Sequence, residues 1–172
     1  MKVVIIGGVA GGATAAARIR RLDEQAEIVV FERSGFISYA NCGLPYYIGG
    51  TIEDENNLTL QTPESFWRRF RVKMNVHHEA MAIHPDSKTV TVKNLENGKI
   101  LTESYDKLVL SPGAKPIKPG LDGIDSDKIF ALRTVEDTLR LKKYTDEHQP
   151  KSAVVVGGGF IGIEVAENLH DL

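Results

Sequence analysis

The sequence predicts an α/β fold organised around a parallel β-sheet, with a small antiparallel meander and a second α/β unit that is cut short. Three observations carry this prediction. Residues 2–6 form a β-branched run typical of a strand buried in a parallel sheet. A glycine-rich turn at residues 7–12 follows that run directly, and a second such turn lies at residues 157–162. Each turn leads into a stretch with helical character.

The composition is that of an ordinary globular protein. The chain has 172 residues, a formal net charge of −2, 42% hydrophobic residues and 26% charged residues. This near-neutral charge gives no support for a nucleic-acid or anionic-membrane partner. No apolar run approaches the roughly 20 residues of a membrane span, and the N-terminus lacks a signal-peptide cleavage pattern. The single cysteine rules out an internal disulfide, so the sequence favours a cytoplasmic location.

The first turn has the context of a dinucleotide-binding site. A strand at residues 2–6, a helix at 13–22 and a buried strand at 26–31 form one βαβ unit that ends in Glu32. The pyrophosphate is expected on the amides at the helix N-terminus, and Glu32 is expected to accept hydrogen bonds from the ribose hydroxyls. Val9 departs from the G-x-G-x-x-G pattern at its second glycine. The alternative interpretation is a tight turn that binds no ligand.

One face of the first helix is polar and basic. Thr14, Arg18 and Arg21 are spaced at i, i+4 and i+7 and therefore share that face. Such a face is usually only solvated. It is also suited to a phosphorylated substrate, because arginine binds phosphate in a bidentate manner.

Cys42 is the only cysteine of the chain. A lone cysteine is usually a small buried hydrophobic residue. We expect a short helix to begin near Asn41 and to end at Gly49, and a helix dipole favours the thiolate of a nearby cysteine. The positions five residues away hold Ile37 and Tyr47, so no intramolecular dithiol is possible. Cys42 would then form a mixed disulfide, a persulfide or a sulfenic acid.

The middle of the chain predicts a meander of short strands. A helix is expected to begin at Thr62 and Pro63. The strand candidates that follow are residues 72–76, 80–83, 88–93, 99–105 and 105–110, with a hairpin turn at Asn97-Gly98. The histidines of this region do not form a metal-binding pattern, because adjacent residues of a strand point to opposite faces. We therefore predict no metal site.

The last third of the chain predicts a domain crossing and a new α/β unit. Residues 115–127 are rich in proline, glycine and aspartate, and a capping box at residues 134–137 opens a helix that runs to about residue 148. A strand at residues 151–156, the complete G-x-G-x-x-G at 157–162 and a helix at 163–170 then begin a second dinucleotide-binding unit. This unit lacks its second strand and its ribose-binding acid. We expect an N-terminal fragment with a first domain at 1–115, a crossing segment and helix at 116–150, and a truncated domain at 151–172.

These motifs together resemble the two-dinucleotide flavoprotein disulfide reductases. Two dinucleotide signatures lie about 150 residues apart, and Cys42 lies some 30 residues past the first. Residues 38–46, Ser-Tyr-Ala-Asn-Cys-Gly-Leu-Pro-Tyr, are similar to the Ser-Phe-x-x-Cys motif of the single-cysteine branch, with Tyr39 in place of Phe. That branch includes coenzyme A disulfide reductases, NADH oxidases and peroxidases, and NADH-dependent persulfide reductases. Residues 60–66 and 110–114 match it as well, and it carries valine at the position of Val9.

The resemblance implies a set of site residues. Those implied for FAD are Gly7, Gly8, Val9, Ala10, Gly11, Gly12, Glu32, Arg33, Ala80, Ser111, Gly113 and Arg133. Those implied for the NAD(P)H pyrophosphate are Gly157, Gly158, Gly159, Phe160, Ile161 and Gly162. Those implied for the substrate are Thr14, Arg18, Arg21, Ser38 and Asn41. A lysine that the branch carries after the helix around Phe66 is absent in register, and Arg69 and Arg71 are the candidates to replace it.

The resemblance also implies an activity and a homodimer. A hydride would pass from NAD(P)H to FAD, and a Cys42 mixed disulfide with a coenzyme A-type disulfide or persulfide would then be reduced. An NADH oxidase or peroxidase that uses a Cys42 sulfenic acid is the first alternative. A flavin-binding redox sensor without turnover is the second. The family's FAD site and dimer interface also use later parts of the chain.

Overall fold

A computed structural model describes residues 1–172 and divides the chain into two compact units. The first unit comprises Met1–Tyr39 and Thr59–Gly113. The second unit comprises Ala40–Leu58 and Ala114–Leu172. Both units are therefore discontinuous in sequence, and residues 40–58 leave the first unit to join the second.

The first unit is built on a four-stranded parallel sheet, as the sequence predicts. The strand order is β5-β2-β1-β9, and all three neighbouring pairs are parallel. The central strand β1 pairs through Val4 with Val29 on one side and with Leu108 on the other. The strands are β1 (Lys2–Ile6), β2 (Glu27–Phe31), β5 (Lys73–Asn75) and β9 (Lys107–Leu110).

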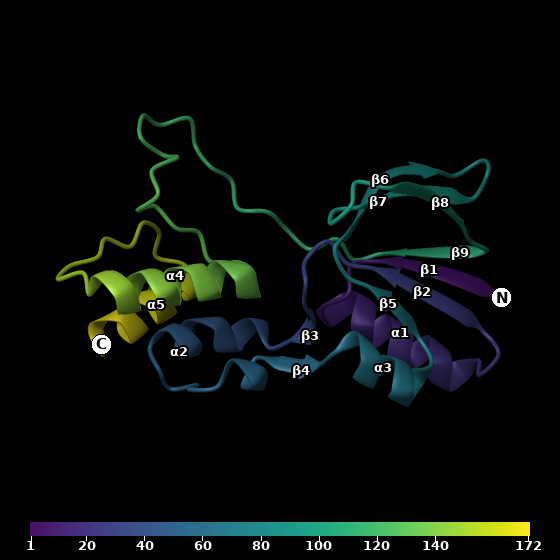
Figure 1. The fold of residues 1–172 in the computed structure, drawn as a ribbon, viewed down its shortest axis with the longest axis horizontal. Helices are drawn as coiled ribbons and strands as arrows, with labels where there is room; N and C mark the ends of the chain where they lie inside the picture. Colours follow the sequence, from purple (N-terminus) through teal and green to yellow (C-terminus); the bar gives the residue numbers. More distant parts are fainter. The chain divides into compact units, whose positions relative to one another are not determined.

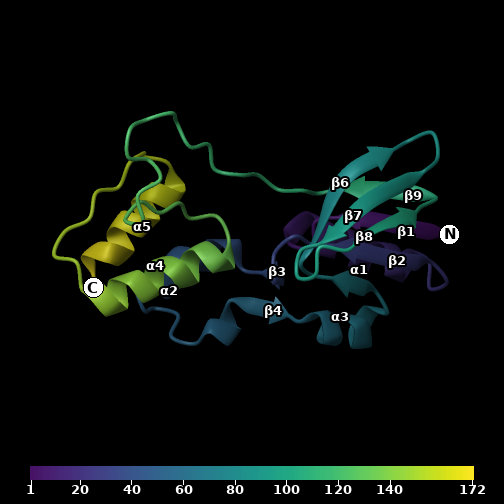
Figure 2. The same ribbon diagram turned by 45° about the horizontal axis from the view of Figure 1, so that its top comes forward.

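Helices cover one face of this sheet and an antiparallel sheet covers the other (Figure 1). The helices are α1 (Ala10–Leu22) and α3 (Pro63–Phe70). The antiparallel sheet has the order β6-β7-β8 and consists of β6 (His78–His84), β7 (Thr89–Asn94) and β8 (Ile100–Ser104), which lie over β1 and β9 in Figure 2. Val3 and Ile5 face the helical core, whereas Val4 packs against the antiparallel sheet. Successive residues of a strand point to opposite faces, so β1 is apolar throughout.

A short two-stranded ribbon in the first unit was not predicted. β3 (Ile37–Tyr39) pairs antiparallel with β4 (Thr59–Gln61). Each strand has only three residues, too few for a periodic pattern to emerge from the sequence. The ribbon is joined to the first glycine-rich turn because the Ser38 N–H donates to the carbonyl oxygen of Gly8 at 3.0 Å.

The second unit is helical. A single 3₁₀ turn, η1 (Asn41–Gly43), leads into α2 (Leu44–Ile48), and a further 3₁₀ turn, η2 (Glu55–Asn57), follows. α2 packs against α4 (Val135–His148) and α5 (Phe160–His170). The predicted capping box of α4 is present, since Thr134 and Asp137 each accept a hydrogen bond from the other's backbone N–H. The residues buried in this unit are Leu44, Pro45, Ile48, Leu58, Val135, Thr138, Val165 and Asn168.

The predicted strand at residues 151–156 is wrong for this chain. These residues form no strand, and Val154 and Val156 are 89% and 94% exposed. A strand needs a hydrogen-bonded neighbour, and none pairs with these residues in the described chain. None of the helices combines the length and apolar character needed to cross a membrane.

Candidate functional site

The first glycine-rich turn closes on itself and on the end of β9. Gly7 has a φ of +97°. A methyl group on Gly7 would overlap the carbonyl oxygen of Ser111, and one on Gly12 would overlap the carbonyl oxygen of Gly7. Only glycine fits both positions, because the backbone segments lie where a Cβ atom would otherwise be. The turn therefore presents backbone, and not side chains, to the space around it.

The N-terminus of α1 is open for an anion. The helix begins at Ala10, three residues earlier than predicted, and Val9 is its N-cap without a side-chain hydrogen bond. The amides of the first turn of a helix have no partner within the helix, and their dipoles favour a negative charge. The cap position does not require a positive φ, and Val9 has a φ of −95°. The departure of Val9 from the glycine pattern is therefore compatible with a phosphate-binding turn.

Glu32 is fixed against the same turn. Its carboxylate accepts the Gly8 N–H at 2.7 Å on one oxygen and the Ser34 N–H at 2.8 Å on the other. An ionised carboxylate has about four acceptor sites, so about two remain for the hydroxyls of a ribose. The role of Ser34 was missed, because a serine two residues after an acid carries no distinctive signal. The neighbouring Arg33 is exposed and lies 3.7 Å from Glu79.

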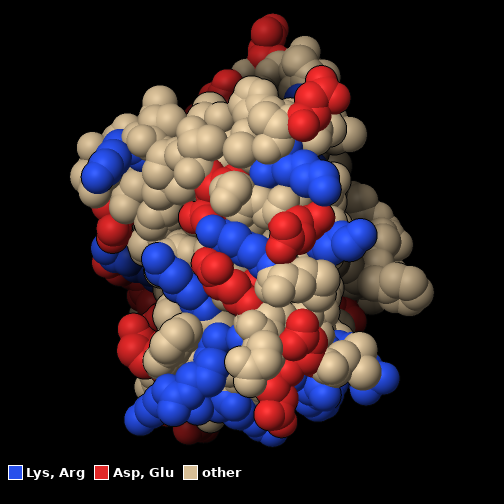
Figure 3. All heavy atoms as spheres, turned by 90° about the vertical axis from the view of Figure 1, so that its right-hand side faces the viewer, with Lys and Arg blue, Asp and Glu red and all other residues tan.

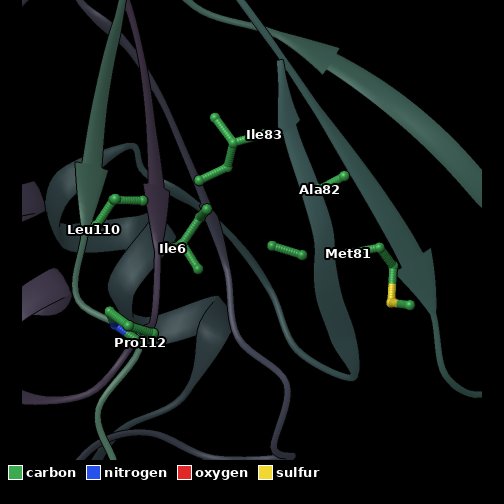
Figure 4. A pocket seen from close by; sticks show the side chains of 7 residues that line it. Ile6, Met81, Ala82, Ile83, Leu110 and Pro112 are labelled. Atoms are coloured by element: carbon green, nitrogen blue, oxygen red, sulfur yellow. The ribbon is translucent and has the colours of Figure 1, made fainter. Parts of the chain in front are cut away.

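The end of β9 and residues 80–83 of β6 border an apolar cavity of about 320 Å³ (Figure 4). The Ser111 N–H donates to the carbonyl oxygen of Ile6 at 2.8 Å, and Gly113 has a φ of +70°. Figure 4 shows the side chains of Ile6, Ile83 and Leu110 directed toward the same space. The full lining is Ile6, Ala80, Met81, Ala82, Ile83, Leu110 and Pro112. The structure thus brings Ala80 and the segment around Ser111 together with the turn.

The predicted basic face is exposed in the first unit. Thr14, Arg18 and Arg21 are exposed along α1, and neither arginine forms an ion pair with any residue of the described chain. Ser38 is half-buried in the ribbon and has a φ of +47°. A guanidinium without an ion pair keeps its donors for an external anion.

The second glycine-rich turn repeats the local geometry of the first within the second unit. Gly157 has a φ of +110°, and a methyl group on Gly162 would overlap the carbonyl oxygen of Gly157. α5 begins at Phe160, three residues earlier than predicted, and its N-cap Gly159 has no side-chain hydrogen bond. These features again leave helix amides open to an anion.

Cys42 is an exposed free thiol in the second unit. It lies in the 3₁₀ turn that precedes α2, so the continuous helix expected from Asn41 to Ile48 is divided into two pieces. Exposure contradicts the interpretation of Cys42 as a buried hydrophobic residue and leaves its sulfur accessible to a second sulfur or to an oxidant. Asn41 is half-buried beside it.

Arg133 also belongs to the second unit. It is half-buried, and its backbone N–H donates to the Asp137 carboxylate at 3.0 Å. Among residues 1–172, no group of three His, Cys, Asp or Glu side chains is arranged to hold a metal ion.

Comparisons with known proteins place these features in a family. The model of the family described as "Pyridine nucleotide-disulphide oxidoreductase" matches residues 1–172. Coenzyme A disulfide reductase of Staphylococcus haemolyticus is 45% identical over 169 residues, which cover 98% of this chain and 38% of that protein. The chain therefore spans little more than a third of the length of this curated relative.

Three solved structures share the fold. Reduced Bacillus anthracis CoADR-RHD has a TM-score of 0.96 and 50% identity, covering 99% of this chain and 31% of that chain. The NAD-dependent persulfide reductase of A. fulgidus has a TM-score of 0.94 and 36% identity, covering 99% and 32%. The water-forming NADH oxidase of Lactobacillus brevis, bound to NADH, has a TM-score of 0.90 and 38% identity, covering 98% and 37%. These matches confirm the fold class and the resemblance inferred from the sequence.

Proposed function

The chain belongs to the pyridine nucleotide-disulphide oxidoreductase family, and on that premise we propose that it is the N-terminal part of an enzyme that reduces coenzyme A disulfide or a persulfide through Cys42. The observation that carries the proposal is the exposed single thiol in a chain that also holds two open dinucleotide turns. Electrons would come from NAD(P)H and pass through FAD. We propose the divisions at residues 115 and 150 as the domain limits of the full-length enzyme.

The residues of the first unit fit FAD. Gly7 and Gly12 allow the backbone of the turn to pack where Cβ atoms would otherwise lie, and the open amides of α1 suit a pyrophosphate. Glu32 keeps acceptor sites for a ribose, Ala80 lines the neighbouring cavity, and Ser111 lies against Gly7 and Gly11; we assign Gly113 to the same cofactor. When bound, the flavin supplies two-electron redox chemistry that no side chain of the chain can supply. We also assign Arg33 and Arg133 to this cofactor, and the turn from Gly157 to Gly162 to the NAD(P)H pyrophosphate.

Cys42 would carry the sulfur chemistry. Its thiolate attacks one sulfur of the substrate disulfide, the substrate S–S bond breaks, and one thiolate leaves while a mixed disulfide forms. Two electrons then reduce the mixed disulfide, which releases the second thiol and restores the Cys42 thiolate. Ile37 and Tyr47 occupy the positions where a second cysteine would lie. The sulfur partner of Cys42 is therefore external to this chain.

The preference for a coenzyme A-type substrate rests on the basic face of α1. Coenzyme A carries several phosphate groups, and Arg18 and Arg21 are exposed and free of ion pairs. We include Thr14, Ser38 and Asn41 among the substrate contacts. We also propose that the full-length enzyme is a homodimer located in the cytoplasm, where a free thiol remains reduced.

The test uses a full-length protein that contains this chain. A Cys42→Ser variant should lose NAD(P)H-dependent reduction of coenzyme A disulfide while it retains bound FAD. An Arg18→Ala, Arg21→Ala variant should raise the KM for coenzyme A disulfide at least roughly ten-fold, because each lost charge-assisted hydrogen bond is worth about 1.5–3 kcal/mol. Arg140→Ala, which removes an exposed arginine of α4, is the matched control. Full activity in the serine variant would refute the thiol mechanism.

An NADH oxidase or peroxidase is the second candidate. The resemblance to the water-forming NADH oxidase and the exposure of Cys42 favour it, because an accessible thiolate can be oxidised to a sulfenic acid. Oxygen consumption with NADH, at a rate above that of coenzyme A disulfide reduction, would establish this activity. A flavin-binding sensor would show neither turnover, and Cys42→Ser would then change only its response to oxidants.

A further inference from the structure

Arg20 uses all of its hydrogen-bond donors inside the first unit. It lies in the last turn of α1, between the exposed Arg18 and Arg21. Its Nε donates to the carbonyl oxygen of Phe70 at 2.8 Å. The other four N–H groups donate to the carbonyl oxygens of Asp23 (3.2 Å), Glu24 (2.6 Å), Ala26 (2.6 Å) and Arg71 (3.1 Å). A guanidinium has five N–H groups, so none remains for a ligand.

These five bonds join the C-terminal ends of two helices. Three of the acceptors follow α1, and two lie at the end of α3, 50 and 51 residues away in sequence. The last carbonyl groups of a helix have no acceptor role within the helix. Arg71 also has a φ of +53°, a left-handed conformation that costs free energy in a non-glycine residue. At this helix end Arg20 donates to the carbonyl groups of Phe70 and Arg71, and it is therefore bonded directly to the residue that has this conformation.

Five exposed arginines flank the joined helix ends, and we call them the arginine surface. They are Arg18 and Arg21 of α1, Arg68 and Arg69 of α3, and Arg71. None of them forms an ion pair, although Arg69 lies over the ring of Phe70 at 5.0 Å and Arg71 over that of Trp67 at 5.9 Å. Figure 3 shows Lys and Arg side chains gathered along the lower edge of one face. Like charges at the ends of two joined helices repel one another, so a fixed arrangement of them needs a support.

We propose that Arg20 is a positioning residue that holds the arginine surface in the arrangement that receives a polyanionic substrate. It acts through the backbone of Arg71 and the end of α3, and does not touch the substrate. The inference rests on the proposed function, because it assumes that Arg18 and Arg21 contact the phosphates. Lysine cannot replace Arg20, because an ammonium group presents three donors from one atom and cannot bond to five carbonyl groups.

The test compares Arg20→Lys with the unchanged full-length enzyme. The substitution keeps the charge and removes the planar fork. We expect the KM for coenzyme A disulfide to rise roughly ten-fold. This rise corresponds to the loss of about one charge-assisted hydrogen bond between the enzyme and its substrate. We expect kcat to change by less than about two-fold, because the effect is on binding. The KM for hydroxyethyl disulfide, which is uncharged, should remain unchanged, and Arg140→Lys is the matched control.

The outcomes separate this proposal from the function on which it rests. Equal losses for both disulfides would mean a purely structural role and would overturn the proposal. An unchanged KM in Arg20→Lys, with a raised KM in Arg18→Ala, Arg21→Ala, would also overturn it and leave the proposed function standing. An unchanged KM in the double variant would refute both.

Amide hydrogen exchange gives a measurement that does not depend on a folded variant. In the unchanged enzyme, the Arg71 amide donates to Trp67 at 2.8 Å and should be protected without any substrate. Added coenzyme A should leave that protection unchanged. Protection that appears only with coenzyme A would show that the ligand, and not Arg20, orders this surface.

Discussion

The two glycine-rich turns of this chain have the same local geometry in different surroundings. In each, the first glycine has a strongly positive φ, +97° at Gly7 and +110° at Gly157, and a helix begins three residues later. In each, the last glycine lies against the carbonyl oxygen of the first. The first turn follows a strand that is paired on both sides, whereas the second follows exposed residues that form no strand.

This difference separates what a motif determines from what a fold determines. The turn forms in both places because glycine permits a backbone that other residues resist. The strand forms only where neighbouring strands supply hydrogen bonds and apolar cover. The conformation of a dinucleotide-binding turn is thus determined by its own residues, whereas the rigidity of the surrounding site depends on the neighbouring strands.

The largest contrast is expected when both turns receive the same methyl group. Gly12→Ala should destabilise the 172-residue chain by about 3 kcal/mol or more, because Ser111 lies against Gly7 and Gly11 and prevents the turn from moving aside. Gly162→Ala should cost only about 1 kcal/mol, since Gly158 and Gly159 have no close neighbours and the turn can shift. Urea unfolding measures both. Gly120→Ala, at a position with open space, is the control, and equal losses at the two turns would contradict the comparison.

The residues that precede the two turns should differ by a smaller amount in their effect on stability. Val4 is fully buried and Val154 is 89% exposed, so the same truncation samples opposite environments. Val4→Ala should lower the free energy of unfolding by about 2 kcal/mol, through lost burial and the cavity left behind. Val154→Ala should change it by less than about 0.5 kcal/mol.

A full-length protein sharpens this second contrast. If later chain supplies neighbours for residues 151–156, Val154→Ala should become as costly there as Val4→Ala. A cost that stays near zero in the longer protein would show that these residues remain uncovered.

The smallest difference in stability is expected for the lysines at the start of the two segments that precede the turns, residues 2–6 and 151–156. Lys2 forms ion pairs with Glu103 and with Glu27, the latter at 3.3 Å, whereas Lys151 is exposed and forms none. The hydrogen bond to Glu103 is the main cause that raises the pKa of Lys2. Lys2→Met should cost up to about 1 kcal/mol at neutral pH, and Lys151→Met should have no effect.

The pH dependence has a defined sign. The folded-state pKa of Lys2 lies above its unfolded value, so its contribution is fully present below about pH 10 and is lost as the pH rises through the folded pKa. The stability difference between the unchanged chain and Lys2→Met should therefore shrink only in alkaline solution. A difference that shrinks between pH 5 and pH 8 would point to another group.

Much of the fold could be predicted because its signals are local. The β-branched runs before Gly7 and around Val29 identified the central strands, and both capping residues of α4 were identified from their spacing. Both glycine-turn helices begin three residues earlier than predicted, because glycine has a low helix propensity and hides the first turn of the helix.

The features that were missed depend on contacts distant in sequence. The strands β3 and β4 have too few residues to show a periodic pattern. In the sequence they are separated by residues 40–58, which belong to the other unit. The role of Arg20 depends on carbonyl groups some 50 residues away, and nothing in the sequence distinguishes the half-buried Arg20 from the exposed Arg21. The exposure of Cys42 likewise follows from tertiary packing and not from its neighbours in the sequence.

The discontinuity of the two units has a consequence for the order of folding during synthesis. Residues 40–58 leave the ribosome early, yet Leu44 and Ile48 are buried against α4 and α5, which are translated about 90 to 120 residues later. Gly49 and Asn168 lie so close that a methyl group on Gly49 would overlap the asparagine side chain. The segment that carries Cys42 therefore has no packing partners from α4 and α5 while the strands of the first unit are still being synthesised. The apolar side chains of α2 next to Cys42 can be buried completely only after α5 has been made.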